Sequence, residues 1–260
     1  MAPSDLALAI EAARGAGEII RRAFRTPLHV EYKSADQPVT AADAGADAFL
    51  RRTLLAGGSS YGWISEESDT ALGSSGTIWV VDPLDGTVNF IEGRPAFAVC
   101  IALLQVGEPV LGVVYNPITD ELYTAENGSS TLNGHPISAG TWQTPPRLVV
   151  SWGEIERYRM AGLANEWRLV TVGSTALKLM EVAKGAAEAY VSSAPKKIWD
   201  VCAAGFIAQT AGATVRDLSG RSLNYSTESA DVAGTIAVAK GGEPFIERLV
   251  ALGRESDADR

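Results

Sequence analysis

Residues 78–90 decide the fold, and they read Ile78-Trp79-Val80-Val81-Asp82-Pro83-Leu84-Asp85-Gly86-Thr87-Val88-Asn89-Phe90. The apolar run at the start predicts a buried strand, and Pro83 predicts its end because proline cannot donate a hydrogen bond to a neighbouring strand. We expect Asp85 at the N-cap of a following helix. The N–H groups of Gly86 and Thr87 would then be free at the positive end of the helix dipole.

This stretch has two interpretations. Carboxylates that can bind a cation would lie beside N–H groups that can bind an anion, which suits metal-assisted phosphate chemistry. A turn with Asp85 as a purely structural cap explains the same residues equally well. The choice between the two depends on whether the rest of the chain supplies partners for Asp82 and Asp85.

The composition limits the possible functions. The chain has 260 residues, of which 46% are hydrophobic and 20% charged, and a formal net charge of −9. This length can bury a substantial core, in one large domain or in two lobes. The negative charge argues against nucleic-acid binding over a general basic surface, and no apolar run is long enough to cross a bilayer. An acidic protein that handles a phosphate ester needs local positive charge, which metal ions held by acids would supply.

The cysteines and histidines are few. Cys100 and Cys202 lie in apolar segments, so we expect reduced core residues of a cytoplasmic protein. The start of the chain lacks the basic residues of a secretory signal, which fits the same compartment. With two Cys and two His, none in ligand-like spacing, a structural zinc site is not expected. Oxygen ligands favour Mg²⁺ or a similar hard cation.

The pattern of predicted elements changes near residues 141–147, which contain two consecutive prolines. Before this point we predict helices over 4–24 and 39–56, and strands over 29–33, 61–65, 98–106, 110–115, 121–125 and 130–132, the last four as an antiparallel meander. After it, strands over 148–151, 168–172, 187–191, 214–218 and 235–239 alternate with helices over 154–163, 174–184, 198–211 and 243–252. We therefore expect an α+β lobe over 1–140 and an α/β lobe over 141–260, packed as one compact unit.

Asp200 is the acid with the strongest case for a bound cation. It lies in the first turn of a predicted helix that is apolar nearly all round, so its carboxylate should be buried. The helix dipole stabilises such an acid by roughly 0.3–1 kcal/mol, which is small against the cost of burying an unpaired charge. A metal ion would offset that cost, although Lys196 or Lys197 could be the partner instead.

Glu66 follows the strand predicted over 61–65, as Asp82 follows its own strand. If the two strands are neighbours, the two carboxylates lie together. The nearby charged residues have ordinary explanations on the sequence alone. Glu67 fits a solvated turn, Asp43 a surface acid in mid-helix, and Lys33 an exposed lysine.

Several blocks of the chain resemble the inositol monophosphatase family. The residues from Asp82 to Phe90 resemble its first signature, and Trp199-Asp200-Val201-Cys202-Ala203-Ala204 resembles its second. Two further blocks follow the expected order: Val39-Thr40-Ala41-Ala42-Asp43 and Ile64-Ser65-Glu66-Glu67-Ser68. Gly173-Ser174-Thr175-Ala176-Leu177 resembles the family's substrate loop. The similarity runs from about residue 5 to about residue 252.

The resemblance implies an α+β fold, a layered α-β-α-β-α sandwich of the sugar-phosphatase type. It also implies Mg²⁺-dependent hydrolysis of a small phosphate monoester, with two or three ions per site. Carried over position by position, the first ion would be held by Glu66, Asp82 and the Leu84 carbonyl. The second would be held by Asp82, Asp85 and Asp200, and Glu66 would help with a weaker third ion.

The resemblance further implies the catalytic and substrate residues. Asp43 and Thr87 would orient or deprotonate the attacking water, and Glu66 would be the third catalytic residue. The substrate contacts would come from Gly86, Thr87, Gly173, Ser174, Thr175, Lys33 and Lys196. No cysteine or histidine nucleophile is required, which disfavours a phosphoenzyme. A homodimer and inhibition by lithium are expected from the resemblance alone.

The segment before Trp199 departs from the family pattern. Animal-type inositol phosphatases carry an acid there that binds sugar hydroxyls, whereas this chain has Lys196 and Lys197 and no acid. Solvated lysines are the simpler explanation. The alternative is that one lysine binds a second anionic group, as a bisphosphate or nucleotide substrate would offer.

The favoured substrate is inositol monophosphate or a related polyol or sugar phosphate. Histidinol phosphate, fructose 1,6-bisphosphate and 3′-phosphoadenosine 5′-phosphate are alternatives on the same fold. From other classes come a non-catalytic regulator on this scaffold and a module that binds a sugar phosphate without cleaving it. The complete acid set argues against the regulator, and Asp43 with Thr87 against the binding module, because only hydrolysis needs a positioned water. The expected partner is a small phosphorylated metabolite, and neither nucleic acid nor a membrane.

Overall fold

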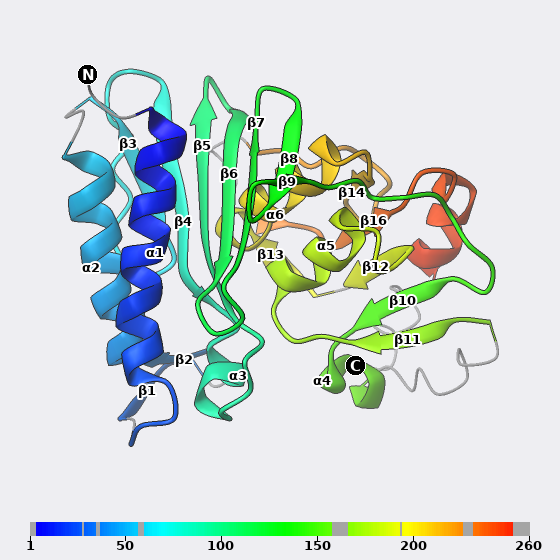
Figure 1. The fold of residues 1–260 in the computed structure, drawn as a ribbon, viewed down its shortest axis with the longest axis horizontal. Coiled ribbons are helices and arrows are strands. Elements are labelled where there is room, and N and C mark those ends of the chain that lie inside the picture. Colours follow the sequence, from blue (N-terminus) through cyan, green and yellow to red (C-terminus); the bar gives the residue numbers. More distant parts are fainter. Residues whose placement is uncertain are drawn as a thin grey trace.

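The computed structural model describes residues 4–27, 29–34, 37–56, 60–157, 166–192, 194–225 and 231–251. These residues form a layered sandwich in which helices and sheets alternate (Figure 1). A pair of helices covers a seven-stranded sheet, a second pair lies between this sheet and a five-stranded one, and short helices cover the far face of the smaller sheet. The layered α+β architecture that the sequence implied is confirmed.

The outer layer consists of α1 (Asp5–Ala23) and α2 (Ala41–Leu55). Each helix packs an apolar face against the larger sheet. We predicted α2 from residue 39, but Thr40 caps it and the residues before Ala41 belong to a strand. That strand, β2 (Gln37–Thr40), pairs antiparallel with β1 (Val30–Ser34).

The larger sheet has the strand order β3-β4-β5-β6-β7-β8-β9. Strands β3 and β4 are parallel, and each later pair is antiparallel, as the predicted meander requires. The bounds are β3 (Gly62–Ser65), β4 (Thr77–Asp85), β5 (Ala98–Gln105), β6 (Glu108–Asn116), β7 (Glu121–Glu126), β8 (Ser129–Leu132) and β9 (His135–Pro136). Strand β9 was not predicted.

Strand β4 is buried along its whole length. Trp79 and Val81 belong to the core beneath α1 and α2, whereas Ile78 and Val80 belong to the core on the other face of the sheet. Successive side chains of a strand point to opposite faces. A continuous apolar run is therefore what a strand covered on both faces needs.

The end of β4 differs from the prediction. The strand does not stop at Pro83 but continues to Asp85, and its pairing with β5 shifts register between Asp82 and Asp85. This irregularity accommodates a proline that cannot donate to the ladder. The helix that follows, α3 (Thr87–Ile91), has Gly86 and not Asp85 at its N-cap. Gly86 has a φ of 100°, a conformation that glycine adopts without a Cβ penalty.

Helices α5 (Thr175–Ala183) and α6 (Ile198–Thr210) lie between the two sheets. α6 contacts β4, β5, β6 and β7 on one side, and α5 contacts β10, β12 and β16 on the other. This position explains why α6 is apolar nearly all round. Cys202 on α6 and Cys100 on β5 are both buried and free, as predicted.

The smaller sheet has the order β11-β10-β12-β16-β14. Its strands are β10 (Arg147–Val150), β11 (Arg168–Thr171), β12 (Ala189–Ser192), β14 (Thr214–Arg216) and β16 (Thr235–Val238). Strands β11, β10 and β12 are parallel, and β16 is antiparallel to β12 and β14. A further short pair consists of β13 (Lys196–Lys197) and β15 (Asp231–Val232).

The last layer covers the far face of the smaller sheet. It contains α4 (Trp152–Arg157) and a 3₁₀ turn, η2 (Glu243–Phe245), which continues as helix over 246–251. Ile155 and Leu249 from this layer pack against Leu148 and Val150. Residues 158–163 of the predicted helix 154–163 lie outside the described residues.

The division into lobes at residue 140 stays a prediction. The core between the two sheets draws on both sides of that boundary, for example through Val80 and Ala203. Within the described ranges, no helix combines the length and the apolar character needed to cross a lipid bilayer.

Candidate active site

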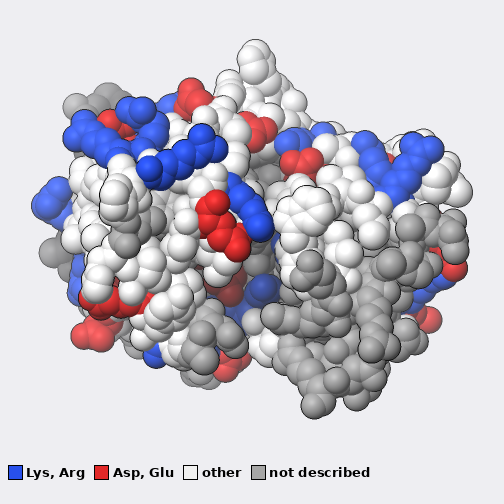
Figure 2. All heavy atoms as spheres, turned by 90° about the horizontal axis from the view of Figure 1, so that it is seen from below, with Lys and Arg blue, Asp and Glu red and all other residues white. Residues whose placement is uncertain are grey.

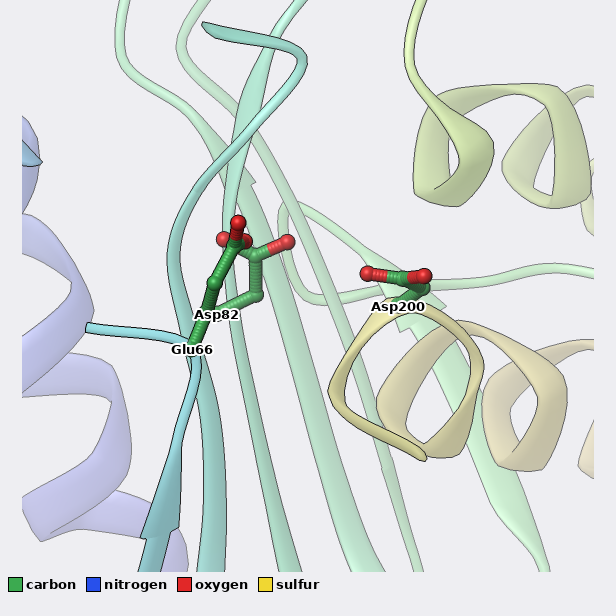
Figure 3. Close-up of side chains that lie close together, drawn as sticks. All are labelled: Glu66, Asp82 and Asp200. Atoms are coloured by element: carbon green, nitrogen blue, oxygen red, sulfur yellow. The ribbon is translucent and has the colours of Figure 1, made fainter. Parts of the chain in front are cut away.

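Three carboxylates from different elements meet at one end of the larger sheet (Figure 3). Glu66 follows β3, Asp82 lies on β4, and Asp200 is in the first turn of α6. One carboxylate oxygen from each lies within 4.8 Å of the other two. Because β3 and β4 are parallel neighbours with Ser65 beside Val81, Glu66 lies level with Asp82. The neighbouring acid-ended strands that the sequence suggested are therefore present.

The environment of these acids disfavours their ionised forms. Asp82 is 2% exposed, and burial raises its pKa well above the ordinary value, with Glu66, Asp85 and Asp200 adding to the effect. Burial also raises the pKa of Asp200, to about 7, against the opposing charge of Lys196. A bound cation stabilises such a cluster in its ionised form. An all-oxygen donor set fits a hard divalent ion.

Asp85 faces the same cavity but has protein partners. Its Oδ2 accepts hydrogen bonds from Ser174 Oγ (2.5 Å) and the Ala176 N–H (2.6 Å), and its Oδ1 accepts one from the Thr175 N–H (3.3 Å). Asp85 therefore caps α5 from the end of β4. Its role as a ligand of a second ion stays a prediction, and so does that of the Leu84 carbonyl.

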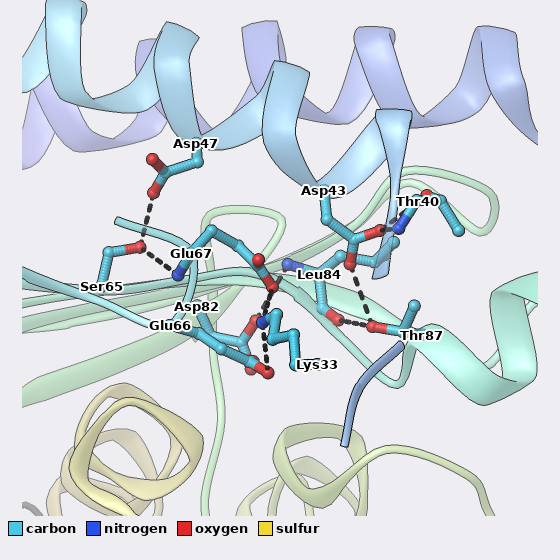
Figure 4. Close-up of polar contacts among 10 residues, drawn as sticks. All are labelled: Lys33, Thr40, Asp43, Asp47, Ser65, Glu66, Glu67, Asp82, Leu84 and Thr87. Carbon is cyan, nitrogen blue, oxygen red and sulfur yellow. Dashed lines mark hydrogen bonds and ion pairs between the residues drawn. The ribbon is translucent and has the colours of Figure 1, made fainter. Parts of the chain in front are cut away.

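Asp43 and Thr87 form a second polar group beside the acids (Figure 4). Thr87 Oγ1 lies 3.0 Å from Asp43 Oδ1 and 3.1 Å from the Leu84 carbonyl oxygen. Asp43 Oδ2 accepts hydrogen bonds from the Thr40 N–H (2.8 Å) and hydroxyl (2.6 Å), which makes a capping box at the start of α2. The surface position in mid-helix that we considered for Asp43 is wrong. The side chain is 1% exposed, and burial raises its pKa.

Lys33 is exposed, as its simple explanation requires, but it is ion-paired, and Glu67 differs from its simple explanation. Lys33 Nζ lies 2.5 Å from Glu67 Oε1 and 3.2 Å from Glu66 Oε1. The Glu67 side chain is 8% exposed and is therefore not part of a solvated turn. Burial lowers the pKa of Lys33, but the ion pairs with Glu67 and Glu66 outweigh it and leave the pKa raised.

A cavity of about 610 Å³ opens over the carboxylates. Its lining includes all the predicted metal residues and all the predicted substrate residues except Lys33: Glu66, Asp82, Leu84, Asp85, Asp200, Gly86, Thr87, Gly173, Ser174, Thr175 and Lys196. Figure 2, seen from below, shows charged atoms of both signs in the furrow between the left and right parts of this face. The structure separates the two lysines of β13. Lys196 lines the cavity, whereas Lys197 forms an ion pair with Asp231.

Comparisons with known proteins agree with this geometry. A model of the inositol monophosphatase family matches residues 3–242. The chain belongs to the inositol monophosphatase family. The members of this family are phosphatases, and the protein is a phosphoric monoester hydrolase.

Three relatives illustrate the range of this phosphatase family. Inositol monophosphatase 3 of Solanum lycopersicum is 35% identical over 260 residues, which cover 94% of this chain and 96% of that protein. The 3'(2'),5'-bisphosphate nucleotidase CysQ of Salmonella typhimurium is 34% identical and covers 82% of this chain and 91% of its own. The crystal structure of extragenic suppressor protein suhB from Bartonella henselae superposes with a TM-score of 0.84 at 29% identity, over 95% of this chain and 98% of that one.

One charged pair in the cavity of this family member escaped the sequence analysis. Lys178 on α5 and Glu154 on α4 line the cavity and lie 2.8 Å apart, Nζ to Oε2. A signal was present, because Lys178 is a lone charge between Leu177 and Leu179 in an otherwise apolar stretch of helix. Arg94, which also lines the cavity and pairs with Glu92, carried no comparable signal.

Proposed function

We propose that this enzyme hydrolyses the phosphate monoester of a small polyol or sugar, with inositol monophosphate as the leading candidate. The main support is that carboxylate oxygens of Glu66, Asp82 and Asp200 lie within 4.8 Å of one another at a cavity of about 610 Å³. That volume suits a small ligand. The relative from Solanum lycopersicum named inositol monophosphatase 3 supports the choice of substrate class.

The cation requirement follows from the donor set. Glu66, Asp82 and Asp200 would hold Mg²⁺, and Asp85 and the Leu84 carbonyl would complete a site for two or three ions. Bound Mg²⁺ would lower the pKa of water and neutralise charge on the phosphoryl oxygens. Lys33, paired with Glu66 and Glu67, limits the negative charge at the edge of this cluster.

The proton of the attacking water has an acceptor within the protein. The Thr87 hydroxyl can take a proton from water and pass its own proton to Asp43 Oδ1, 3.0 Å away. Burial raises the pKa of Asp43, which favours its protonated form once the proton has moved. This pair supports hydrolysis over simple binding, because a binding module needs no proton acceptor beside the water.

Two glycines let the cavity walls approach each other. A Cβ on Gly86 would lie 2.9 Å from the Ala96 carbonyl oxygen, and a Cβ on Gly173 would lie 2.4 Å from the Asn89 side chain. A Cβ on Gly86 would also lie 3.2 Å from Ser174 Cβ, so the turn after β4 approaches the loop before α5 closely because Gly86 has no side chain. This close packing supports Gly86, Thr87 and the loop of Gly173, Ser174 and Thr175 as the receptor for the phosphate.

A bisphosphate is the second candidate substrate. Lys196 lines the cavity and offers a cation to a second anionic group, and the relative CysQ is named a bisphosphate nucleotidase. We favour a monophosphate because the other cationic side chains of the cavity already have acidic partners and are less available to a second phosphate. Lys178 pairs with Glu154, and Arg94 pairs with Glu92.

A phosphate-release screen tests the proposal. The purified enzyme with Mg²⁺ should release phosphate from inositol monophosphate faster than from fructose 1,6-bisphosphate or 3′-phosphoadenosine 5′-phosphate, and not at all in excess EDTA. Asp85→Asn should abolish this release while the circular dichroism spectrum stays that of the wild type. Activity near wild type in Asp85→Asn would refute the assigned site. A preference for a bisphosphate that Lys196→Ala removes would favour the second candidate.

Three further family traits belong to the proposal. We expect inhibition by lithium through competition at one cation position, a homodimer, and a cytoplasmic enzyme without a nucleic-acid or membrane partner. These expectations rest on the family resemblance and on the composition.

A further inference from the structure

The cavity wall carries a buried pair of opposite charges that the proposed phosphate chemistry does not use. Glu154 comes from α4 and Lys178 from α5, and their side chains are 12% and 5% exposed. Both line the cavity that also contains Asp85 and Asp200. The pair therefore lies in the same cavity as the predicted metal and phosphate residues.

The pair has hydrogen-bonding atoms that the contacts between Glu154, Lys178 and Ser151 do not use. Glu154 Oε2 accepts hydrogen bonds from the Ser151 N–H (2.6 Å) and from Lys178 Nζ (2.8 Å). Within the described residues, both of these hydrogen bonds to the Glu154 carboxylate end at Oε2, and the Ser151 hydroxyl is a further neighbour of that carboxylate. An ammonium group has three donors, and Glu154 uses one of those on Lys178. Glu154 Oε1 and the other donors of Lys178 can therefore bind a ligand.

Each group stabilises the charged form of the other. Burial raises the pKa of Glu154, but the charge of Lys178 and the hydrogen bonds from Lys178 and Ser151 outweigh it, so the pKa lies below the ordinary value. Burial lowers the pKa of Lys178, and Glu154 opposes this effect. A carboxylate beside an ammonium has no net charge, which makes the pair a weak receptor for a second phosphate.

Part of the pair has a structural role, because Glu154 and Ser151 cap the start of α4 reciprocally and Lys178 Nζ lies 5.0 Å from the centre of the Tyr190 ring. Leu177, Leu179 and Met180 around Lys178 are buried and apolar. Well-packed apolar residues often replace a buried ion pair without loss of stability. A carboxylate acceptor beside an ammonium donor matches adjacent hydroxyl groups, because each hydroxyl is both a donor and an acceptor.

We propose that Glu154 and Lys178 form a subsite that binds hydroxyl groups of the substrate's alcohol, with Glu154 Oε1 accepting from one hydroxyl and Lys178 Nζ donating to it or to its neighbour. This inference rests on the proposed function and narrows it to esters of vicinal diols. The subsite selects a polyol phosphate over an ester of the same charge that lacks hydroxyls.

The test compares two monoesters, inositol 1-phosphate and phenyl phosphate. Glu154→Gln should lower kcat/KM for inositol 1-phosphate by about 10- to 100-fold, as expected when a charged hydrogen-bond acceptor is lost. The ratio of kcat/KM for inositol 1-phosphate to that for phenyl phosphate should fall at least about tenfold. Because this variant leaves Lys178 without its partner, the double variant Glu154→Gln/Lys178→Met is measured in parallel, and it should show the same fall in the ratio.

A matched control separates binding from stability. Glu188→Gln also removes a buried carboxylate from an ion pair, with the partly exposed Arg147, but Glu188 does not line the cavity. This control should leave the substrate ratio unchanged. An unchanged ratio in both Glu154 variants, or the same fall in the control, overturns the subsite. So does a wild-type preference for fructose 1,6-bisphosphate that the double variant removes, because the pair would then bind an anion. If the wild type hydrolyses no polyol phosphate at all, the proposed function fails first.

Discussion

At the scale of single residues, the Thr87 hydroxyl has one proton and two acceptors. Asp43 Oδ1 lies 3.0 Å and the Leu84 carbonyl oxygen 3.1 Å from Thr87 Oγ1. A hydroxyl donates to one acceptor at a time. Thr87 can therefore change partner at little cost, which is what a group that relays a proton to Asp43 requires.

Replacing Thr87 tests this relay. Thr87→Val keeps the shape but removes the hydroxyl, and kcat with saturating Mg²⁺ should fall by about 10²- to 10³-fold, within the range of general-base contributions. Thr87→Ser keeps the hydroxyl and should retain most of the activity. The comparison is made by steady-state kinetics, with the thermal midpoint as a check on folding. Equal activity of the two variants would contradict the relay.

At the scale of elements, one ion pair joins the starts of two strands in the smaller sheet. Arg147 begins β10, and Glu188 directly precedes β12, its parallel neighbour. Glu188 Oε2 accepts hydrogen bonds from the Arg147 N–H (2.7 Å) and Nε (2.9 Å), and Oε1 accepts one from Nη2 (2.6 Å). The pair joins the starts of β10 and β12, and α4 with its Glu154 follows the opposite end of β10.

Glu188→Gln should lower the free energy of unfolding by about 1.5–3 kcal/mol near neutral pH. Burial raises the pKa of Glu188, but the hydrogen bonds from Arg147 outweigh it and hold the pKa below 4.5. A lowered pKa in the folded state stabilises the protein fully above pH 4.5, and this contribution is lost as the pH falls through the folded-state pKa. We therefore expect the variant and the wild type to differ less in their free energy of unfolding at about pH 3 than at about pH 7, as measured by urea unfolding. A difference that is the same at both pH values would mean that the charge of Glu188 contributes nothing.

At the scale of the whole molecule, the acid cluster joins elements from distant parts of the chain. Glu66 and Asp82 come from neighbouring strands of the larger sheet, and Asp200 comes from a helix between the sheets. Burial and mutual repulsion make the ionised cluster unfavourable without a cation. A bound cation would therefore stabilise the packing of α6 against the sheet.

Asp82→Asn should make this coupling visible. In EDTA the variant should melt at a higher temperature than the wild type, because it carries one fewer buried acid in the cluster. Added Mg²⁺ should raise the melting midpoint of the wild type and should have little effect on that of the variant. At a Mg²⁺ concentration of about 100 times the dissociation constant, the free energy of unfolding of the wild type should increase by about 2.7 kcal/mol. Differential scanning fluorimetry measures both. Equal Mg²⁺-dependent shifts would show that Asp82 is not needed to hold the ion.

Much of the fold was predictable because it rests on local patterns. The apolar run of β4, the amphipathic α1 and the uniformly apolar α6 each reflect how many of their faces are covered. The errors came where two local rules compete. Pro83 normally ends a strand, but pairing with β5 continues past it through a shift in register. Gly86 took the N-cap position assigned to Asp85, because the turn needs a positive φ.

The sequence by itself determined that acids lie after β3, on β4 and in the first turn of α6, because these positions follow from local apolar and helix-start patterns. Only the tertiary structure decided how the charges pair. Lys33 binds Glu67 and Glu66, Asp85 caps α5, and Lys178 binds Glu154. These partners lie far apart in the chain, and no local pattern specifies a distant partner. The physical reason is that the cost of burying a charge is offset by whichever opposite charge or N–H group the packing of the layers brings within reach.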